Sequence, residues 1–258
     1  MNLKNSYIIM IMLLLIFGIM VPAGAQPLDV DQIFDRVEEN QVKFDNSKTH
    51  GEMILIDEDG DKEIREIIMF EKDEEDDEIT MLMRFLSPSS VEGVTLLSIK
   101  NGEKMYLYMP AYQKPRRIAG TSKQENFMGT DFSYEDLSLD YQSAEYQKKL
   151  LEEQDEQYMI EVIPDEDEVS YKKFIVYVNK KDFYVEEVEF YNLNEEKTKT
   201  LQIKEIKKDE EGKITPIVLE INNLKENHQT RMNIQEIEYD LDLSSSFFSI
   251  RTLRKPRL

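Results

Sequence analysis

Hydrophobic and polar residues change their period once along this chain of 258 residues. In the early stretch LDVDQIFDRVEENQVKF, apolar residues recur at the three- and four-residue spacing of a helix, and Asp29 stands where an N-cap would lie. This spacing predicts one amphipathic helix from about Val30 to Asn40. From about residue 51 onward the period becomes two, which is typical of strands with one buried face.

Alternating stretches, separated by polar or acidic turns, continue almost to the end of the chain. Asp-Gly at 59–60 and Asn-Gly at 101–102 lie between apolar runs and favour hairpins. A weaker strand pattern occurs at KPRRI and a short helical one near Ser133–Asp140. We expect roughly eleven or twelve strands and no helix long enough to connect parallel strands, so the pattern predicts an antiparallel meander in one domain. A meander of this length must curl, close or be covered on one face.

The first 25 residues have the anatomy of a secretory signal peptide. An uncharged apolar run covers Ile8 to Val21, and Ala23 and Ala25 occupy the small positions of a cleavage site. We expect cleavage after Ala25 and a single mature domain over 26–258. A membrane anchor is the alternative, although the apolar run is short for a span. The chain has no cysteine, which excludes a lipid-modified cysteine at the cleavage point and any disulfide.

The charge is strongly negative but unevenly distributed. The chain carries 53 acids against 32 bases, a net charge of −21, and many of the acids lie in turns. Solvated acidic loops favour solubility, and this field argues against nucleic acid as a partner. After the predicted signal peptide, two basic segments lack acids altogether: Lys104–Gln124, with five bases, and the C-terminal FFSIRTLRKPRL, with four.

A search for catalytic and metal-binding patterns finds none. Cysteine and G-x-S-x-G nucleophiles are missing, and the two histidines, His50 and His228, have no ligand spacing. The acidic stretch at 57–63 departs from the calcium-loop pattern, because Lys62 stands where that loop needs glycine. A carboxylate pair for glycoside hydrolysis is not excluded by counting acids, but nothing singles one out. We therefore predict no catalytic residue, no metal and no cofactor.

Several motifs resemble one family. FLSPSSVEGVTLL (85–97), YLYMPA (106–111), RRIAG (116–120) and FMGTDFSYEDL (127–137) are similar to the outer-membrane lipoprotein-sorting protein family, the exported LolA-like proteins, and IFDRVEEN (33–40) fits the opening helix of that family. The chain departs from the family pattern in having no tryptophan before its YLYMP element. The resemblance implies a half-open barrel of about eleven antiparallel strands around an apolar cavity, with a few short helices and loops as its lid. It also implies a periplasmic location and acyl chains of a lipid or lipoprotein as the ligand.

The resemblance and the alternation together give two groups of candidate residues. The expected cavity wall comprises Met81, Met83, Phe85, Leu97, Ile99, Tyr106, Tyr108, Phe174, Val176 and Val178. The expected lid and rim comprise Arg116, Arg117, Phe127, Met128, Gly129, Asp131 and Tyr134. Ordinary core filling is the alternative for the methionines, and lid packing is the alternative for the aromatic residues. The two arginines either meet anionic head groups at a membrane surface or pair internally with Asp131, Glu135 or Asp136.

Three functions remain open at this point. The first is a carrier that binds acyl chains and transfers or sorts them in the cell envelope. The second is an envelope sensor or accessory protein that binds a protein partner such as a membrane exporter or acceptor. The third, a secreted hydrolase with two carboxylates, has the least support because no pair stands out.

Overall fold

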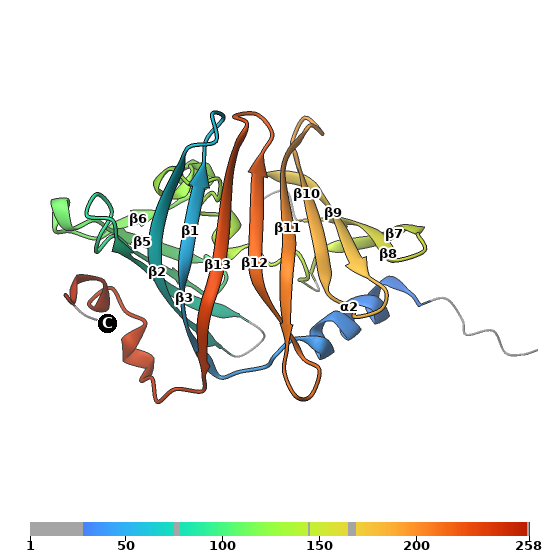
Figure 1. The fold of residues 1–258 in the computed structure, drawn as a ribbon, viewed down its shortest axis with the longest axis horizontal. Coiled ribbons are helices and arrows are strands. Elements are labelled where there is room, and N and C mark those ends of the chain that lie inside the picture. The colour runs from blue at the N-terminus through green and yellow to red at the C-terminus, as the bar shows by residue number, and fades with distance from the viewer. Residues whose placement is uncertain (1–27, 75–77, 144, 165–168, 257) are drawn as a thin grey trace, which may run out of the picture.

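The computed structural model describes residues 28–74, 78–143, 145–164, 169–256 and 258. The predicted signal peptide, residues 1–25, lies outside this part of the chain. The described residues form a mainly β structure with one α-helix and thirteen strands (Figure 1). The α-helix is α2 (Val30–Asn40), and the strands are β1 (Asn46–Ile56), β2 (Lys62–Asp73), β3 (Ile79–Ser87), β4 (Thr95–Ile99), β5 (Lys104–Tyr108), β6 (Arg116–Ile118), β7 (Gln147–Glu153), β8 (Gln157–Ile163), β9 (Tyr171–Asn179), β10 (Val185–Asn192), β11 (Lys197–Lys208), β12 (Ile214–Asn223) and β13 (His228–Tyr239).

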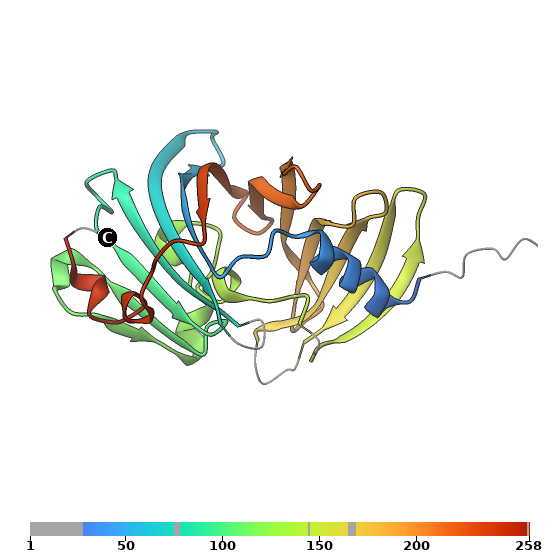
Figure 2. The same ribbon diagram turned by 90° about the horizontal axis from the view of Figure 1, so that it is seen from below.

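All thirteen strands belong to one antiparallel sheet, in the order β6-β5-β4-β3-β2-β1-β13-β12-β11-β10-β9-β8-β7. The mainly β, antiparallel and open architecture predicted from the sequence is confirmed. The expected number of strands was one or two too low, and the weak pattern at KPRRI is a real strand, β6. The sheet is an arch with one concave and one convex face, and its two edge strands do not meet (Figure 2).

The sheet consists of two meanders, β1–β6 and β7–β13, rather than one. They join where β1 pairs with β13, with Ser47 opposite Tyr239 at one end and Ile56 opposite Gln229 at the other. Because β6 and β7 lie at opposite edges, the connection between them must pass from one edge to the other. We call this connection the crossing segment, residues 119–146, of which all but residue 144 are described. It passes through the inside of the arch (Figure 2).

At one position of the β1–β13 junction the two backbones approach so closely that the residue must be glycine. Alternate residues of β1 are buried along the whole strand. The register shifts between His50 and Gly51, and a Cβ on Gly51 would collide with the carbonyl oxygen of Asn233. Only glycine fits there without displacing the backbone of β13.

Helix α2 has the predicted bounds and the predicted cap. The Asp29 side chain accepts a hydrogen bond from the Gln32 backbone at 2.8 Å, and the Gln32 side chain accepts one from the Asp29 backbone at 3.2 Å. Ile33, Phe34 and Val37 are buried, so the helix covers the concave face at the β7 side of the arch. The short helix expected near Ser133–Asp140 is a single 3-10 turn, Asp136–Ser138.

The chain after β13 folds back onto the convex face. This C-terminal strap, residues 241–256, contains two 3-10 turns, Ser245–Phe247 and Thr252–Arg254. It lies beside the β2–β5 side of the arch in both ribbon views (Figures 1 and 2). Phe248 and Leu253 of the strap pack against Phe70, Leu82 and Leu97 of the sheet.

Candidate functional site

Methionine gathers on the concave face between β1 and β6. Nine methionines follow residue 26, and eight of them lie in one apolar cluster, which we call the methionine cluster. The ninth, Met159, lies on β8 outside it. The eight are Met53, Met69, Met81, Met83, Met105, Met109, Met128 and Met232. Methionine side chains are flexible and polarisable, so a wall built from them adapts to contents of irregular shape.

Aromatic residues of the crossing segment fill the space over this cluster. Phe127 is completely buried and stacks on Phe85 of β3, with ring centroids 5.4 Å apart. Tyr134 meets the edge of the Phe127 ring at 5.5 Å, and Phe132 is also buried there. The crossing segment therefore lies over the concave face as a lid, and its own side chains supply the packing.

Polar contacts fix this lid on the β1–β2 and β13 side. Arg65 of β2 donates from Nη1 to the carbonyl oxygen of Met128 at 2.6 Å, and its Nε pairs with Glu63 at 2.8 Å. The Asp131 carboxylate lies 2.7 Å from His228 Nδ1 and accepts a 2.7 Å hydrogen bond from the Thr230 hydroxyl. Because Asp131 is 1 % exposed, these partners satisfy a charge that would be costly if left alone.

A second set of polar contacts fixes the lid on the β9–β11 side. Glu135 accepts hydrogen bonds from the Ser170 backbone at 2.6 Å and from its hydroxyl at 2.8 Å, yet burial raises the pKa of this carboxyl. Asp136 pairs with Lys199 Nζ at 2.6 Å and accepts from the Tyr171 hydroxyl at 2.7 Å. Burial, followed by the Asp136 charge, raises the pKa of Tyr171 well above its usual value, so this hydroxyl stays a donor.

The apolar lining continues past the methionine cluster. A second cluster on the concave face joins α2 to β8, β9 and β10 through residues such as Phe34, Ile160 and Phe190. Leu201 of β11 packs against both clusters, so one apolar surface runs along most of the inside of the arch.

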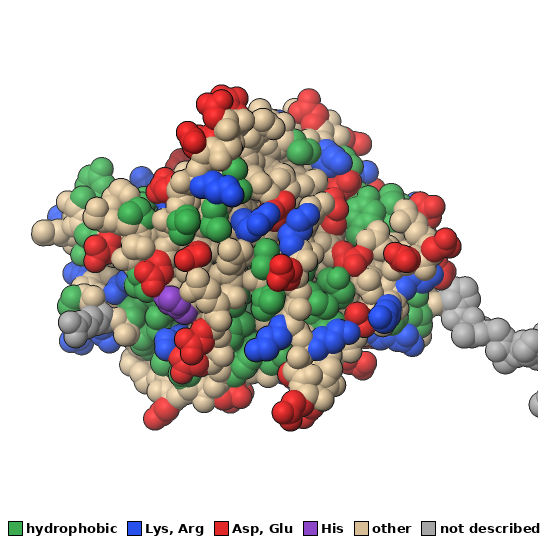
Figure 3. Space-filling model, viewed as in Figure 1, with side chains coloured by type: hydrophobic (Ala, Val, Ile, Leu, Met, Phe, Trp, Pro, Cys, Tyr) green, Lys and Arg blue, Asp and Glu red, His purple; other side chains and the backbone are tan. Residues whose placement is uncertain are grey.

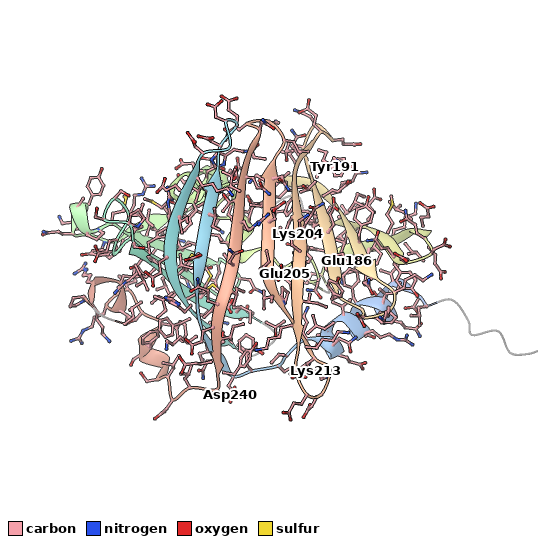
Figure 4. The ribbon with its side chains drawn as sticks, viewed as in Figure 1. Glu186, Tyr191, Lys204, Glu205, Lys213 and Asp240 are labelled. Atoms are coloured by element: carbon pink, nitrogen blue, oxygen red, sulfur yellow. The ribbon has the colours of Figure 1, made fainter. Side chains whose placement is uncertain are left out.

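The convex face over β10–β13 is polar by comparison. Glu220 of β12 pairs with Arg231 at 2.7 Å and lies 3.9 Å from Lys204. Figure 4 shows Lys204, Glu205 and Glu186 on this outer side of the sheet. The two faces of the arch therefore differ in chemistry, and the concave face carries the features expected of a site for an apolar ligand.

The structure divides the ten predicted wall residues between the two faces. Six lie on the concave side, with Met81, Met83 and Phe85 in the methionine cluster and Phe174, Val176 and Val178 in the α2 cluster. The other four, Leu97, Ile99, Tyr106 and Tyr108, lie on the convex face under the C-terminal strap. Alternation could not separate these sets, because β3 and β4 are buried on both faces and a shift of one residue exchanges them.

The predicted rim residues also separate. Phe127, Met128 and Tyr134 pack under the lid as described, and Gly129, with φ of +80°, follows Met128 at the bend held by Arg65. Arg116 lies opposite Leu107 and Arg117 opposite Tyr106, so the arginines point to different faces of the sheet, as alternation predicted. Within the described part of the chain neither forms an ion pair, and Asp131, Glu135 and Asp136 have the partners given above.

Sequence reasoning missed the residues that hold the lid and the strap. Arg65 sits in an alternating strand and looks like an exposed residue, but it is 6 % exposed. Arg84 on β3 is 5 % exposed and bonds to the strap. His228, which has no metal-ligand spacing in the sequence, contacts Asp131. Arginine is rarely buried, yet Arg84 lies in a strand with apolar residues on both faces. That combination is the one feature of the sequence that could have drawn attention to Arg84.

No methionine lines either of two pockets formed by the described residues, although Leu55 of the methionine cluster lines one of them. One, of about 330 Å³, lies at the rim and includes Arg65, Gly129 and His228. The other, of about 370 Å³, lies between the end of α2 and the β11–β12 turn and is lined mainly by charged residues. Within the described ranges, no group of three or more potential metal ligands occurs. None of the helices described is long and apolar enough to span a membrane.

Comparison with solved structures defines the class of this fold. A domain from Vibrio parahaemolyticus, described as an outer membrane lipoprotein-sorting protein domain, aligns with a TM-score of 0.80 at 23 % identity, covering 87 % of this chain and 98 % of that one. A DUF1329 family protein from Desulfovibrio piger gives 0.78 at 23 % identity, covering 86 % and 97 %. A LolA superfamily protein from Nitrosomonas europaea gives 0.70 at 18 % identity, covering 86 % and 98 %. The fold is therefore LolA-like, and the predicted resemblance is confirmed.

The sequence itself places the chain in a family. A family model whose description reads "-like: Uncharacterized protein" matches residues 77–255, which is more than half of the chain. The chain belongs to that family. None of the curated proteins matches it significantly.

Proposed function

We propose that this protein is an exported carrier that binds the acyl chains of a lipid or lipoprotein against its concave face and transfers or sorts them in the cell envelope. The observation that carries the proposal is the methionine cluster, in which seven methionines line one face under the crossing segment and the eighth, Met128, belongs to that segment. The periplasmic location rests on the predicted signal peptide and on the description of the Vibrio domain with the same fold.

Binding requires the lid to be exchanged for the ligand. Phe127, Phe132 and Tyr134 occupy the concave face, so an acyl chain would take their place over the methionines. The crossing segment is joined to the sheet by a small number of side-chain contacts, at Arg65, Asp131, Glu135 and Asp136. An acyl chain offers the wall the same kind of contact as the lid, and burial of each CH₂ contributes about 0.8 kcal/mol. Eight such groups would supply about 6 kcal/mol before the cost of moving the lid.

The polar groups at the site support binding rather than catalysis. The carboxylates near the concave face are each held by identified partners, and their contacts link the crossing segment to the sheet. Neither of the two pockets described above is lined by a serine, threonine or cysteine. We therefore assign the site to binding.

The test begins with native mass spectrometry of the protein purified without detergent from a bacterial envelope fraction. We expect a bound mass that extracts into organic solvent and identifies as a lipid or an acylated peptide. Displacement of a fluorescent fatty acid then measures affinity. Replacing Met83 with aspartate places a charge in the wall, and we expect uptake to fall at least tenfold. Because Met83 is buried, Met69→Gln at a partly buried position is the second variant, with a smaller loss expected.

Met159→Asp is the matched control, because it makes the same chemical change outside the methionine cluster. Uptake should remain unchanged in this variant. An apo mass that stays apo after incubation with liposomes and acylated peptides would overturn the carrier. A single stoichiometric protein in a pull-down with that apo protein would then support the alternative, an envelope sensor or accessory protein that binds a partner such as an exporter.

A further inference from the structure

Two segments without acids meet at one end of this acidic protein. The first, Lys104–Gln124, forms β5, β6 and their connection, and the second, residues 247–256 at the end of the C-terminal strap, lies beside them on the convex face. Tyr106 and Tyr108 of β5 pack in one cluster with Phe248 and Leu253 of the strap. Arg117 lies directly opposite Tyr106 on β6, on the same face as the strap. The fold therefore places side by side two basic segments that lie more than 100 residues apart in the sequence.

Buried Arg84 holds the strap in this position. Its Nε donates to Thr95 Oγ1 at 2.7 Å, and its Nη atoms donate to the carbonyl oxygens of Lys255 at 2.8 Å and Leu253 at 3.1 Å. These bonds run from β3 to the last turn of the strap, so the exposed cations of the strap sit on a fixed backbone. The contacts that hold the strap therefore also determine where its basic residues lie.

The cations at this end are exposed and lack ion pairs. We call them the basic end: Lys114, Arg116, Arg117, Arg251, Arg254 and Lys255. None of the six forms an ion pair with any described residue. Many lysines elsewhere on the protein do, for example Lys173 with Glu161 at 2.8 Å and Lys180 with Glu153 at 2.8 Å. Figure 3 shows basic side chains around the C-terminal residue at the left end of the molecule.

Two large apolar side chains project from the same segments. Tyr112, between β5 and β6, is 70 % exposed, and Ile250 in the strap is 40 % exposed. A cationic surface with an exposed tyrosine and isoleucine suits the boundary between anionic head groups and acyl chains, where tyrosine is favoured. Anionic head groups repel the negative charge that the rest of the protein carries. At physiological ionic strength that repulsion is screened within about 8 Å, whereas charges in contact with the surface still act.

We propose that the basic end docks this protein on an anionic phospholipid surface. The acidic turns Asp57–Asp61 and Asp209–Gly212 lie between β1 and β2 and between β11 and β12, outside the two segments that form the basic end. The proposal does not depend on what the concave face binds. It goes beyond the carrier function by assigning a separate surface and a partner to a part of the fold that the acyl-chain site does not use.

The experiment measures co-sedimentation with vesicles at 0.15 M salt. The protein is produced from its full gene and purified from the envelope fraction, and the vesicles contain phosphatidylcholine with or without 30 % phosphatidylglycerol. We expect binding only to the vesicles with phosphatidylglycerol. Each cation near an anionic surface contributes about a fivefold increase in partition, so the triple variant Arg117→Glu, Arg251→Glu, Arg254→Glu should bind about 100-fold more weakly or worse.

The matched control reverses the same number of charges elsewhere. Lys62→Glu, Lys181→Glu and Lys207→Glu change exposed lysines outside the basic end and alter the net charge by the same amount. Binding by this control close to that of the unchanged protein would support the proposal. Equal loss in both triple variants, binding to neutral vesicles, or no binding to either vesicle would overturn it. Fatty-acid displacement by the Arg117 triple variant should stay normal, so a failure of docking is distinguishable from a failure of the carrier function.

Discussion

Replacing Arg84 with methionine should release the C-terminal strap while leaving the sheet folded. Arg84 makes three short hydrogen bonds, to Thr95 Oγ1, Lys255 O and Leu253 O. A hydrogen bond from a charged donor contributes about 1.5–3 kcal/mol. Burial lowers the pKa of the Arg84 guanidinium, so desolvation of the charge offsets part of that gain. The released carbonyl groups also regain water. We therefore expect the docking free energy of the strap to fall by about 2–3 kcal/mol.

Hydrogen exchange can measure this loss where it occurs. The Thr252 amide donates to Ser249 O and the Lys255 amide to Thr252 O, so both report on the strap. A loss of about 2–3 kcal/mol corresponds to exchange roughly 30 to 150 times faster in these amides. Amides of β1 and β13, in the middle of the sheet, should change little. The urea midpoint should shift only slightly, because most of the apolar surface of the protein lies on the other face.

The control for this variant is Thr95→Val, which removes one acceptor on β4 and leaves the bonds to the strap in place. It should accelerate strap exchange far less than Arg84→Met. Unchanged protection of Thr252 and Lys255 in Arg84→Met would refute the reasoning, since the strap would then be held by Phe248 and Leu253 alone. Global loss of protection would refute it as well, because it would make the strap part of the main folding unit.

Two further predictions concern the lid. Phe127→Ala removes a fully buried ring that stacks on Phe85, and we expect it to lower the free energy of unfolding by about 3–4 kcal/mol in urea denaturation. Tyr112→Ala, at a 70 % exposed position, should change it by less than about 0.5 kcal/mol, and similar losses in the two variants would contradict the assigned packing. Glu135→Gln tests the pKa of Glu135, which burial raises in the folded protein. The unfolded chain releases this proton first, so the stability of the unchanged protein relative to the variant should fall as pH rises from 4.5 through the folded pKa. A relative stability that rises over this interval would mean that the bonds from Ser170 outweigh burial.

Local patterns predicted the elements of this fold, and long-range pairing limited what they could predict. The α2 bounds, its Asp29 cap and the alternation of β1 follow from residues close in sequence. The pairing of β1 with β13 does not, because it joins residues as far apart in the sequence as Ser47 and Tyr239. That pairing turns one meander into two and forces the chain between β6 and β7 across the inside of the arch.

The same limit applies to the site. Met81, Met83 and Phe85 share one face of β3, but Leu82 on the other face is also buried, so alternation alone did not identify the concave face. Tyr106 and Tyr108 were predicted to lie on the concave face but lie on the convex face. Their strand, β5, is short, and the strap covers its convex face, so both faces carry apolar residues. Arg65 and Arg84 lie in strands where a lone arginine predicts exposure, and only the segments packed over them reveal their hydrogen-bond acceptors.

The junction between β1 and β13 has a consequence for how the chain can fold. Until β13 has been synthesised, β1 has a partner only in β2, and its other edge is an open row of backbone donors and acceptors. The centre of the arch therefore closes last, after almost the whole chain is available. A topology with such distant pairing folds slowly compared with the speed of local hairpins. The hairpins at the two sides of the arch should thus form before the β1–β13 junction that joins them.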